Sequence, residues 1–381
     1  MNILVVCHYG LYQNLSFSFV HNQVREFVKS GHRVRVIIPN GWGKPGRNGK
    51  PIGKALHISQ VDGVEMYDLR YLTLSGYGEK GFNTRRAIGA IGAHWKRIFR
   101  DFQPDIIHAH TLGFDSDIGA WLKEKWSCPL VVTTHGSDTA GPLQRGQTEQ
   151  LRAACDKADV IVAVSSALKE KLRSCGTVTT PDAVVNGFVP RQVPDHNQRK
   201  PLRIIQVCHL IPLKRVDVTI RAFAALQAKY PDAELCIIGQ GTQRASLESL
   251  CQSLGVTEKV SFLGQLPNDA VFRELCQSTF FVMVSKPEGF GIVYLEAMAA
   301  GCVTIGTEGE GIADVIHSGE NGYLVPADDP EAIVRVLESC LANPQKAAAL
   351  ASAGQTDALA LTWAANGRKY LQLFEKLIQS K

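Results

Sequence analysis

The sequence has no long hydrophobic run and no low-complexity segment. Its apolar start, residues 1–7, has no basic leader and is too short for a signal peptide or a membrane span, so we expect a buried first strand there. A composition of 45% hydrophobic and 20% charged residues over 381 positions excludes disordered and fibrous proteins. It predicts a soluble globular protein of about two domains.

The ten cysteines show no paired spacing of the kind that binds a metal ion. Several of them fall inside apolar stretches that have the pattern of strands or helices. We therefore expect reduced cysteines, buried in the core of a cytoplasmic protein.

Negative charge is scarce in the first half of the chain. Residues 1–190 hold 23 Lys and Arg against 16 Asp and Glu, a surplus of 7, whereas the remainder holds 18 against 20. The net charge of +5 therefore comes from the first half alone. Such asymmetry indicates an anionic partner for that half, either nucleic acid or an acidic membrane surface. The alternative is that the basic residues only keep the protein soluble.

Apolar runs alternate with helical patterns along both halves. In the first half the runs lie at 3–6, 34–39, 105–108, 130–134, 160–164 and 183–185, with a helix expected over 17–30 and a loop over 39–54. In the second half they lie at 203–207, 234–238, 260–262, 280–284 and 303–307. This rhythm is typical of doubly wound parallel sheets, so we predict an α/β protein with two Rossmann-like domains that face a cleft.

The domain boundaries follow from composition and periodicity. Residues 189–203 are rich in proline and polar side chains and have no apolar periodicity. We predict an N-terminal domain over 1–190, a linker over 191–202 and a C-terminal domain over 203–362. The last segment, 363–381, has apolar residues at helical spacing and is expected to pack on the first domain as a closing helix.

The most informative motif places two carboxylates around the start of a helix. Gly289 and Gly291 open the turn, Glu288 precedes it, and Glu296 lies about two helical turns later. Exposed N–H groups at such a helix start favour a phosphate, and carboxylates accept hydrogen bonds from sugar hydroxyls. The motif thus indicates a sugar-nucleotide site. The alternative is a buried helix whose glutamate makes a structural salt bridge.

Together with weaker matches, this motif resembles the family 4 retaining glycosyltransferases, which have the two-domain GT-B fold. The further matches lie at 184–188, 238–241, 310–316 and 321–325, and the resemblance covers the whole chain. It implies that Glu288 contacts the donor sugar and Glu296 the nucleotide ribose. It also makes His135, in the stretch 133–138 that ends a predicted strand, the leading catalytic residue beside Glu288.

The chain departs from the family pattern at the predicted diphosphate clamp. Lys214 is kept, but the usual arginine is His209 and the usual glycine after the lysine is Arg215. A neutral imidazole does not replace a bidentate guanidinium, so either Arg215 swings in, or the phosphates protonate His209, or the clamp is weaker. We expect Lys214 to be the dominant contact with the diphosphate. The first loop has the single Gly10 where many relatives have a glycine pair. The full set of expected donor-binding residues is Lys214, Arg215, His209, Gly10, Gly289, Phe290, Gly291, Ile292, Glu296 and Gly239.

The resemblance implies same-face attack by the acceptor, with the leaving phosphate taking its proton, and therefore no protein nucleophile. No metal or other cofactor is expected. The letters Asp-x-Asp occur at 115–117, but we interpret that segment as the cap of a helix. A zinc site formed by His108, His110 and His135 is an alternative, since imidazoles converge at the ends of adjacent strands.

Residues 84–102 have an apolar helical stripe flanked by five basic residues. Such a helix could lie on an anionic membrane, where lipid-linked acceptors are presented. Packing of the stripe on the sheet is the alternative. Both interpretations hold if the stripe packs inward and only the flanking basic residues touch lipid.

We therefore expect a cytoplasmic or peripheral membrane glycosyltransferase of cell-surface polysaccharide synthesis. Its expected partners are a UDP- or GDP-sugar, a glycan or lipid-linked acceptor and an anionic membrane surface, and no nucleic acid. The alternatives are a sugar-nucleotide epimerase of the same fold, which needs no acceptor, and a catalytically silent nucleotide-sugar-binding scaffold.

Overall fold

The computed structural model of the protein describes residues 1–8, 19–42, 55–73, 81–177, 179, 181–193 and 199–380. The chain forms two units: unit 1 comprises Met1–Gly187 and Trp363–Lys381, and unit 2 comprises Phe188–Thr362. Gly10 and most of the loop expected over 39–54 lie outside the described residues.

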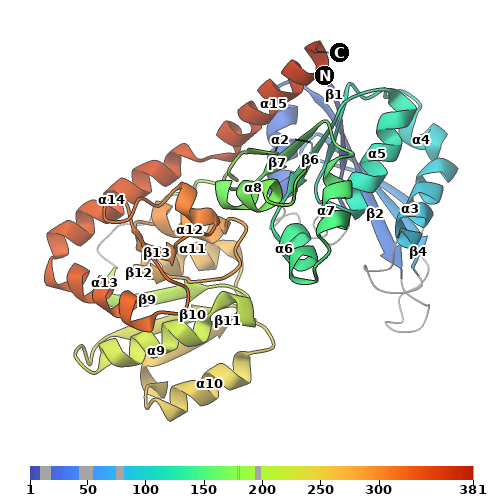
Figure 1. The fold of residues 1–381 in the computed structure, drawn as a ribbon. Coiled ribbons are helices and arrows are strands. Elements are labelled where there is room, and N and C mark those ends of the chain that lie inside the picture. The colour runs from blue at the N-terminus through green and yellow to red at the C-terminus, as the bar shows by residue number, and fades with distance from the viewer. Residues whose placement is uncertain are drawn as a thin grey trace. The chain divides into compact units, whose positions relative to one another are not determined.

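Unit 1 is built on one eight-stranded sheet in the order β3-β4-β2-β1-β5-β6-β7-β8 (Figure 1). All neighbouring strands are parallel except β3 and β4. The strands are β1 (Asn2–Val6), β2 (Arg33–Trp42), β3 (Leu56–Val61), β4 (Val64–Leu72), β5 (Ile106–Ala109), β6 (Leu130–Thr134), β7 (Val160–Ala163) and β8 (Pro181–Ala183). The helices are α2 (Phe19–Lys29), α3 (Phe82–Ala93), α4 (Trp95–Phe99), α5 (Phe114–Trp126), α6 (Ser137–Gln144), α7 (Thr148–Cys155), α8 (Ser166–Arg173) and α15 (Trp363–Gln379).

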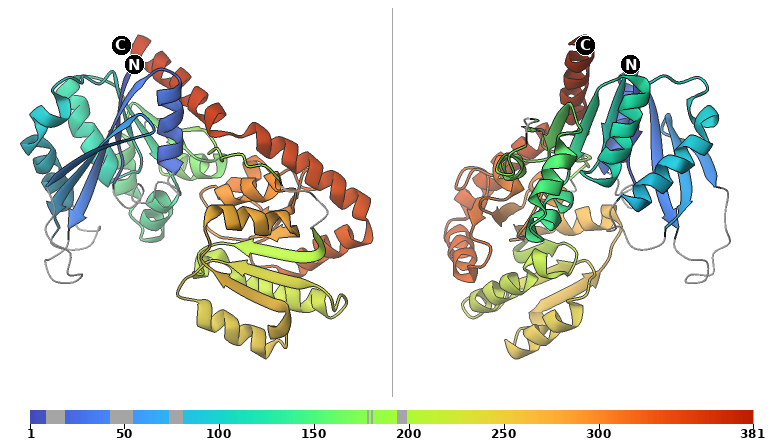
Figure 2. Two further views of the ribbon diagram at one scale, coloured as in Figure 1. Left: turned by 180° about the vertical axis from the view of Figure 1, so that it is seen from behind. Right: turned by 45° about the vertical axis from the view of Figure 1, so that its right-hand side comes forward.

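Helices α2 and α15 cover one face of this sheet and pack against each other (Figure 1; Figure 2, left). Phe27 of α2 and Phe374 of α15 meet at 5.6 Å between ring centroids and are fully buried with Val5 and Val36 of the sheet. Helix α5 covers the opposite face, where Gly119 allows close packing on β5 and β6. Because both faces are covered, the central strands are continuously apolar rather than alternating.

Unit 2 is built on a six-stranded parallel sheet in the order β11-β10-β9-β12-β13-β14. The strands are β9 (Lys200–Val207), β10 (Glu234–Ile238), β11 (Val260–Gly264), β12 (Ser278–Val282), β13 (Val303–Thr307) and β14 (Tyr323–Val325). The α-helices are α9 (Val216–Gln227), α10 (Arg244–Ser253), α11 (Asn268–Cys276), α12 (Ile292–Ala299), α13 (Pro330–Ala342) and α14 (Pro344–Ala360). Short 3-10 helices occur at Pro212–Lys214, Thr257–Lys259 and Gly311–Asp314.

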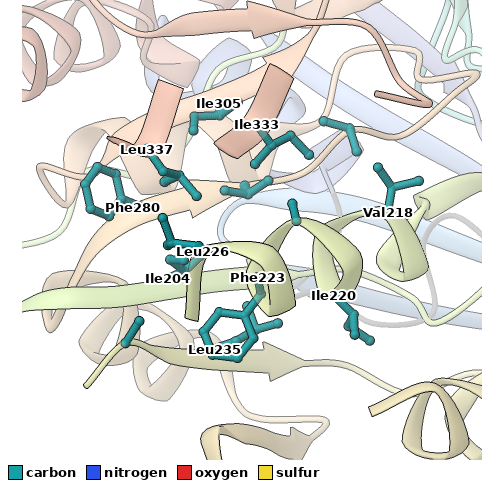
Figure 3. Packing of buried hydrophobic residues seen from close by; sticks show 14 of the residues in the cluster. Ile204, Val218, Ile220, Phe223, Leu226, Leu235, Phe280, Ile305, Ile333 and Leu337 are labelled. Atoms are coloured by element: carbon teal, nitrogen blue, oxygen red, sulfur yellow. The ribbon is translucent and has the colours of Figure 1, made fainter. Parts of the chain in front are cut away.

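The core of unit 2 is apolar throughout. Figure 3 shows Phe223 of α9 and Leu337 of α13 packed with Ile204, Phe280 and other strand residues. Helices α11 and α12 cover the other face, where Tyr294 packs edge-on against Phe281. This doubly wound arrangement in both units confirms the predicted α/β fold class. It also directs the carboxyl ends of neighbouring strands to one edge of each sheet, which is where open α/β sheets bind ligands.

Most predicted strands are present, but some bounds were wrong. The hairpin β3–β4 was missed because β3 is largely exposed and alternates in polarity, although its Asp62-Gly63 turn is a hairpin signal. Strand β2 runs on to Trp42 by pairing with β4, so the loop expected from residue 39 starts later. Strand β9 starts at Lys200, inside the segment expected to be linker, and the short β14 was also missed.

All ten cysteines are free, and the predicted burial is confirmed for nine of them, with Cys208 partly buried.

The single helix expected over 84–102 is wrong, because the chain breaks at His94 into α3 and α4. Its apolar stripe packs inward: Ile91 and Ile98 are fully buried, and Trp95 stacks on Trp126 at 5.6 Å. The alternative prediction, in which the apolar stripe packs on the protein core, is therefore confirmed for these residues.

Candidate active site

The loops that follow β9, β10, β12 and β13 meet at one edge of unit 2, because these strands are consecutive neighbours in the sheet. Two glycines make this approach possible. Gly239 follows β10 with φ of 136°, and a Cβ there would lie 1.8 Å from the carbonyl oxygen of Cys208. A Cβ on Gly311 would lie 2.1 Å from the carbonyl oxygen of Gly289. No side chain is compatible with either contact.

Lys214 and Glu288 form the central ion pair of this edge. The Nζ of Lys214, after β9, lies 2.5 Å from Oε2 of Glu288, after β12, and the two side chains are 20% and 12% exposed. The hydroxyl of Ser285 also donates to Oε2 of Glu288, at 2.8 Å. The backbone N–H of Glu288 donates to the carboxylate of Glu310 at 2.9 Å, which fixes the loop. Lys214 and Glu288, both predicted site residues, thus lie together, are half-buried and are held by their hydrogen bonds.

Helix α12 starts beside this pair. Gly291, with φ of 81°, is its N-cap, Ile292 is its first residue, and Phe290 is buried at 2% exposure. Within the described part of the chain, no side chain caps this helix start. Its first N–H groups are therefore available to an anion, in the way that glycine-opened helices bind phosphate.

Glu296 lies on α12 and has a different cationic partner. Its carboxylate accepts a hydrogen bond from Nη1 of Arg191 at 3.2 Å, and the Nε of Arg191 also bonds Asp269 at 3.2 Å. Burial raises the pKa of Glu296, and Arg191 opposes that rise. The sequence did not single out Arg191, which lies 105 residues before Glu296 in the chain.

The two departures from the family pattern have distinct geometries. His209 is exposed, and its backbone oxygen accepts from Ile211. Arg215 has φ of 48°, in the left-handed region that favours glycine, and serves as N-cap of α9. Its Nε lies 3.4 Å from a carboxylate oxygen of Asp328. The position therefore has the backbone of a glycine while carrying a cation.

At the corresponding edge of unit 1, His135 follows β6 in a turn organised by Asp138. The Asp138 carboxylate accepts hydrogen bonds from the backbone N–H groups of Leu112, His135 and Gly136 and from the hydroxyl of Thr134, at 2.9 to 3.1 Å. Burial raises the pKa of Asp138, while these donors oppose the rise. The sequence did not single out Asp138, although an Asp four residues after a strand end is a recognisable turn signal.

His135 belongs to a group of three close imidazoles. Nδ1 of His110 lies 3.2 Å from Nε2 of His135, and the rings of His108 and His110 are 4.2 Å apart. Nε2 of His108 bonds the hydroxyl of Thr133, which in turn bonds that of Tyr370 on α15. Burial lowers the pKa of His108 and of His135 to about 3 and that of His110 well below its usual value, with neighbouring imidazoles adding to the effect. These rings are neutral at physiological pH.

Among the described residues, no three His, Cys, Asp or Glu side chains are arranged to hold a metal ion. The imidazoles at 108, 110 and 135 stack and hydrogen-bond with one another instead of converging on a point. The residues present therefore do not fit the zinc alternative.

The segment at 115–117 lies in the first turn of α5 and supplies the expected cap through Ser116. Ser116 bonds the N–H of the N-cap residue Gly113, whereas Asp115 is fully buried and accepts from Nδ1 of His8 and the hydroxyl of Thr111, both at 2.8 Å. Burial tends to lower the pKa of His8, but Asp115 outweighs burial and raises it overall. His8, which the sequence did not single out, thus pairs with Asp115 at this edge of unit 1.

Comparison with known proteins identifies the family. The model of glycosyl transferases group 1 matches residues 190–357, and that of glycosyltransferase family 4 matches residues 18–190. The chain belongs to the family 4 glycosyltransferases. It is therefore a glycosyltransferase, and the epimerase alternative is not supported.

A curated relative is the GDP-mannose-dependent α-(1-6)-phosphatidylinositol monomannoside mannosyltransferase of Mycolicibacterium smegmatis, 28% identical over 64% of this chain and 69% of its own. Two solved structures share the GT-B fold. Sucrose-phosphate synthase from Thermosynechococcus elongatus has a TM-score of 0.76 at 18% identity, covering 100% of both chains. HepE from Anabaena, in complex with UDP and glucose, has a TM-score of 0.73 at 17% identity, covering 99% of this chain and 100% of its own.

Proposed function

We propose that this glycosyltransferase transfers a sugar from a nucleoside diphosphate to a glycan or lipid-linked acceptor, with retention of anomeric configuration. The observation that carries the proposal is the Lys214–Glu288 pair beside the uncapped start of α12. A lysine and free N–H groups bind a diphosphate, and a carboxylate binds sugar hydroxyls. The close backbone contacts at Gly239 and Gly311 leave no room for a side chain, so the loops of this edge lie near one another.

The proposed roles follow from this chemistry. Lys214 and the first N–H groups of α12 stabilise the charge that develops on the diphosphate as its bond to the anomeric carbon breaks. Glu288 orients the sugar and Glu296 the ribose, and we assign contact with the donor sugar to His135 as well. The acceptor oxygen forms its new bond on the face that the phosphate leaves, and the phosphate oxygen takes the acceptor proton. The reaction so written needs neither a protein nucleophile nor a metal ion.

The test is a titration of the protein with UDP-, GDP- and ADP-sugars, in which thermal stabilisation and donor hydrolysis are followed together, with and without EDTA. One donor is expected to raise the melting temperature and to release its nucleotide slowly, unaffected by EDTA. Stabilisation without release would favour a silent scaffold, and loss of release in EDTA would contradict metal independence. Absence of any response would reject the donor site.

We further propose that the enzyme acts in cell-surface polysaccharide synthesis at the cytoplasmic face of a membrane. The curated relative named above carries a phosphatidylinositol acceptor in its name, which supports a lipid-linked acceptor. In the described residues no helix is long and apolar enough to cross a bilayer.

The proposed contact with anionic lipid is a surface of unit 1 that we call the basic rim: Leu72, Phe82, Arg85, Arg86, Lys96, Arg97 and Arg100. Leu72 and Phe82 are 43% and 42% exposed, which is high for large apolar side chains. Arg86 donates to the backbone oxygen of Leu72 at 2.7 Å and lies over the ring of Phe82 at 5.1 Å. Exposed apolar side chains beside arginines suit the interface of an acidic bilayer.

A further inference from the structure

His110 is a buried histidine to which the proposed reaction gives no task. It follows β5, is 1% exposed, and its Nδ1 lies 3.2 Å from Nε2 of His135. The two rings are nearly parallel, at 9°. Its other nitrogen, Nε2, is buried and has no hydrogen-bond partner among the described residues. This asymmetry between its two nitrogens determines where the protons lie.

Both rings are neutral, as their lowered pKa values indicate. A neutral imidazole has one N–H and one bare nitrogen, so the bond between His110 and His135 has two possible directions. In the first, His110 donates from Nδ1 and leaves its buried Nε2 bare. In the second, His135 donates from Nε2, and the proton of His110 then lies on its own buried Nε2 without an acceptor.

The first direction is favoured, because a buried N–H without an acceptor is rarer in folded proteins than an acceptor without a donor. The same preference applies to His108. Its Nε2 bonds Thr133 and its Nδ1 is buried without a partner among the described residues, so the proton lies on Nε2.

We infer that His110 fixes the tautomer of His135 by donating to its Nε2, so that His135 carries its own proton on Nδ1. His135 is partly exposed, and its Nδ1 makes no hydrogen bond within the described part of the chain. That nitrogen is therefore an N–H donor open to a ligand oxygen. A donor of this kind suits a sugar hydroxyl or phosphate oxygen, and this assignment of the ligand rests on the proposed function. His110 is thus a positioning residue that acts through His135.

The surroundings hold the pair in place. Asp138 accepts from the backbone N–H of His135, while the ring of Phe19 packs against that of His135 at 4.4 Å. The backbone and the ring of His135 are both restrained. The direction of the His110 bond therefore determines whether Nδ1 of His135 is an N–H donor or a bare acceptor.

The direct test is ¹⁵N NMR of histidine-labelled protein at neutral pH, without any ligand, with His135 assigned by comparison with His135→Ala. The expected spectrum shows His135 protonated on Nδ1 and bare on Nε2. A His135 protonated on Nε2, or on both nitrogens, would overturn the inference.

Two substitutions of His110 extend the test to turnover. In His110→Asn the amide nitrogen takes the place of Nδ1 and still donates, so transfer should stay within about threefold of wild type. In His110→Leu, which has similar volume and no donor, turnover should fall about 10- to 100-fold while nucleotide binding is kept. Equal turnover in both variants, or equal loss in both, would contradict the positioning role.

His108→Gln is the matched control, since it alters a neighbouring buried imidazole without touching Nε2 of His135. It should keep the Nδ1 proton of His135 and turnover within about threefold. If His110→Leu does not fold, the wild-type spectrum and His110→Asn still decide the question. If His135→Ala retains full turnover, the proposed role of His135 fails, whereas the tautomer measurement stands independently.

Discussion

The two proposed ligand-binding edges differ in their electrostatics. In unit 2, Lys214 and Glu288 are half-buried opposite charges 2.5 Å apart. In unit 1, the buried His108 and His110 and the partly exposed His135 have lowered pKa values and are therefore neutral. A charged edge suits a diphosphate, which needs cations and N–H groups. A neutral edge of fixed hydrogen-bond donors suits sugar hydroxyls, which need direction rather than charge. On the proposed function, the charged edge binds the diphosphate and orients the sugar through Glu288, and the neutral edge adds hydrogen-bond donors of fixed direction.

The largest effect is expected from breaking the charged edge. Glu288→Gln removes the charge that holds Lys214 and orients the sugar, so we expect turnover to fall about 100-fold. The fold should survive, since Gln keeps the hydrogen bond from Ser285. Circular dichroism and the melting temperature provide the control, and wild-type transfer rates would remove Glu288 from the site.

The next prediction concerns the basic rim of unit 1 and its proposed binding to anionic lipid. Reversing Arg85 and Arg86 to Glu should weaken binding to anionic vesicles about 10-fold or more, since each basic residue near such a surface contributes about 1 kcal/mol. The same reversal at Lys125 and Arg173, which are exposed outside the basic rim, should have little effect. Vesicle sedimentation measures both, and equal losses would contradict a specific membrane face.

Acid should lower the stability of unit 1 more than that of unit 2. Burial lowers the pKa of His108 and of His135 to about 3, from an ordinary value of 6.5. Between these values the unfolded chain binds more protons than the folded one. The free energy of unfolding should therefore fall as the pH falls from about 6.5 towards 3, by up to about 1.4 kcal/mol per pH unit for each histidine.

Calorimetry between pH 7 and 5 measures this loss. His108→Gln removes one of the three histidines whose pKa values are lowered by burial. The melting temperature of the transition that belongs to unit 1 should therefore decline less steeply with pH in this variant. A decline as steep as that of wild type would show that His108 is not held neutral.

The smallest effect is expected at Arg215. Arg215→Gly relieves the left-handed backbone, at φ of 48°, and removes the cation, so stability should change little. If the guanidinium contributes to diphosphate binding in place of the missing arginine at 209, donor affinity should fall about fivefold. Titration calorimetry with the nucleoside diphosphate decides this, with Arg215→Ala as the comparison that keeps a side chain. Unchanged affinity in both variants would leave Lys214 as the dominant side-chain cation.

The sequence predicted the unit 2 edge better than the unit 1 edge, for a physical reason. Helix α12, its glycines and the spacing of its glutamates are local patterns, and α12 begins at Ile292 as expected. The partner of Glu296 is not local, because Arg191 reaches it from a segment without regular structure. No periodicity encodes such a pair.

The neutral edge depends even more on distant contacts. The hydroxyl of Thr133 bonds that of Tyr370, 237 residues away, and His8 pairs with Asp115 across 107 residues. The sequence indicated His135 through its place after a strand, but which nitrogen each imidazole uses depends on these tertiary contacts. The hairpin β3–β4 was missed for a related reason, since its outer strand packs little apolar surface.

The most direct test of the divided roles measures nucleotide binding and turnover in Lys214→Ala and His135→Ala side by side. The account predicts that Lys214→Ala weakens binding of the nucleoside diphosphate about 10- to 100-fold. His135→Ala should leave that binding within about threefold and lower turnover by about 100-fold instead. Equal losses of nucleotide binding in the two variants, or full turnover in His135→Ala, would contradict it.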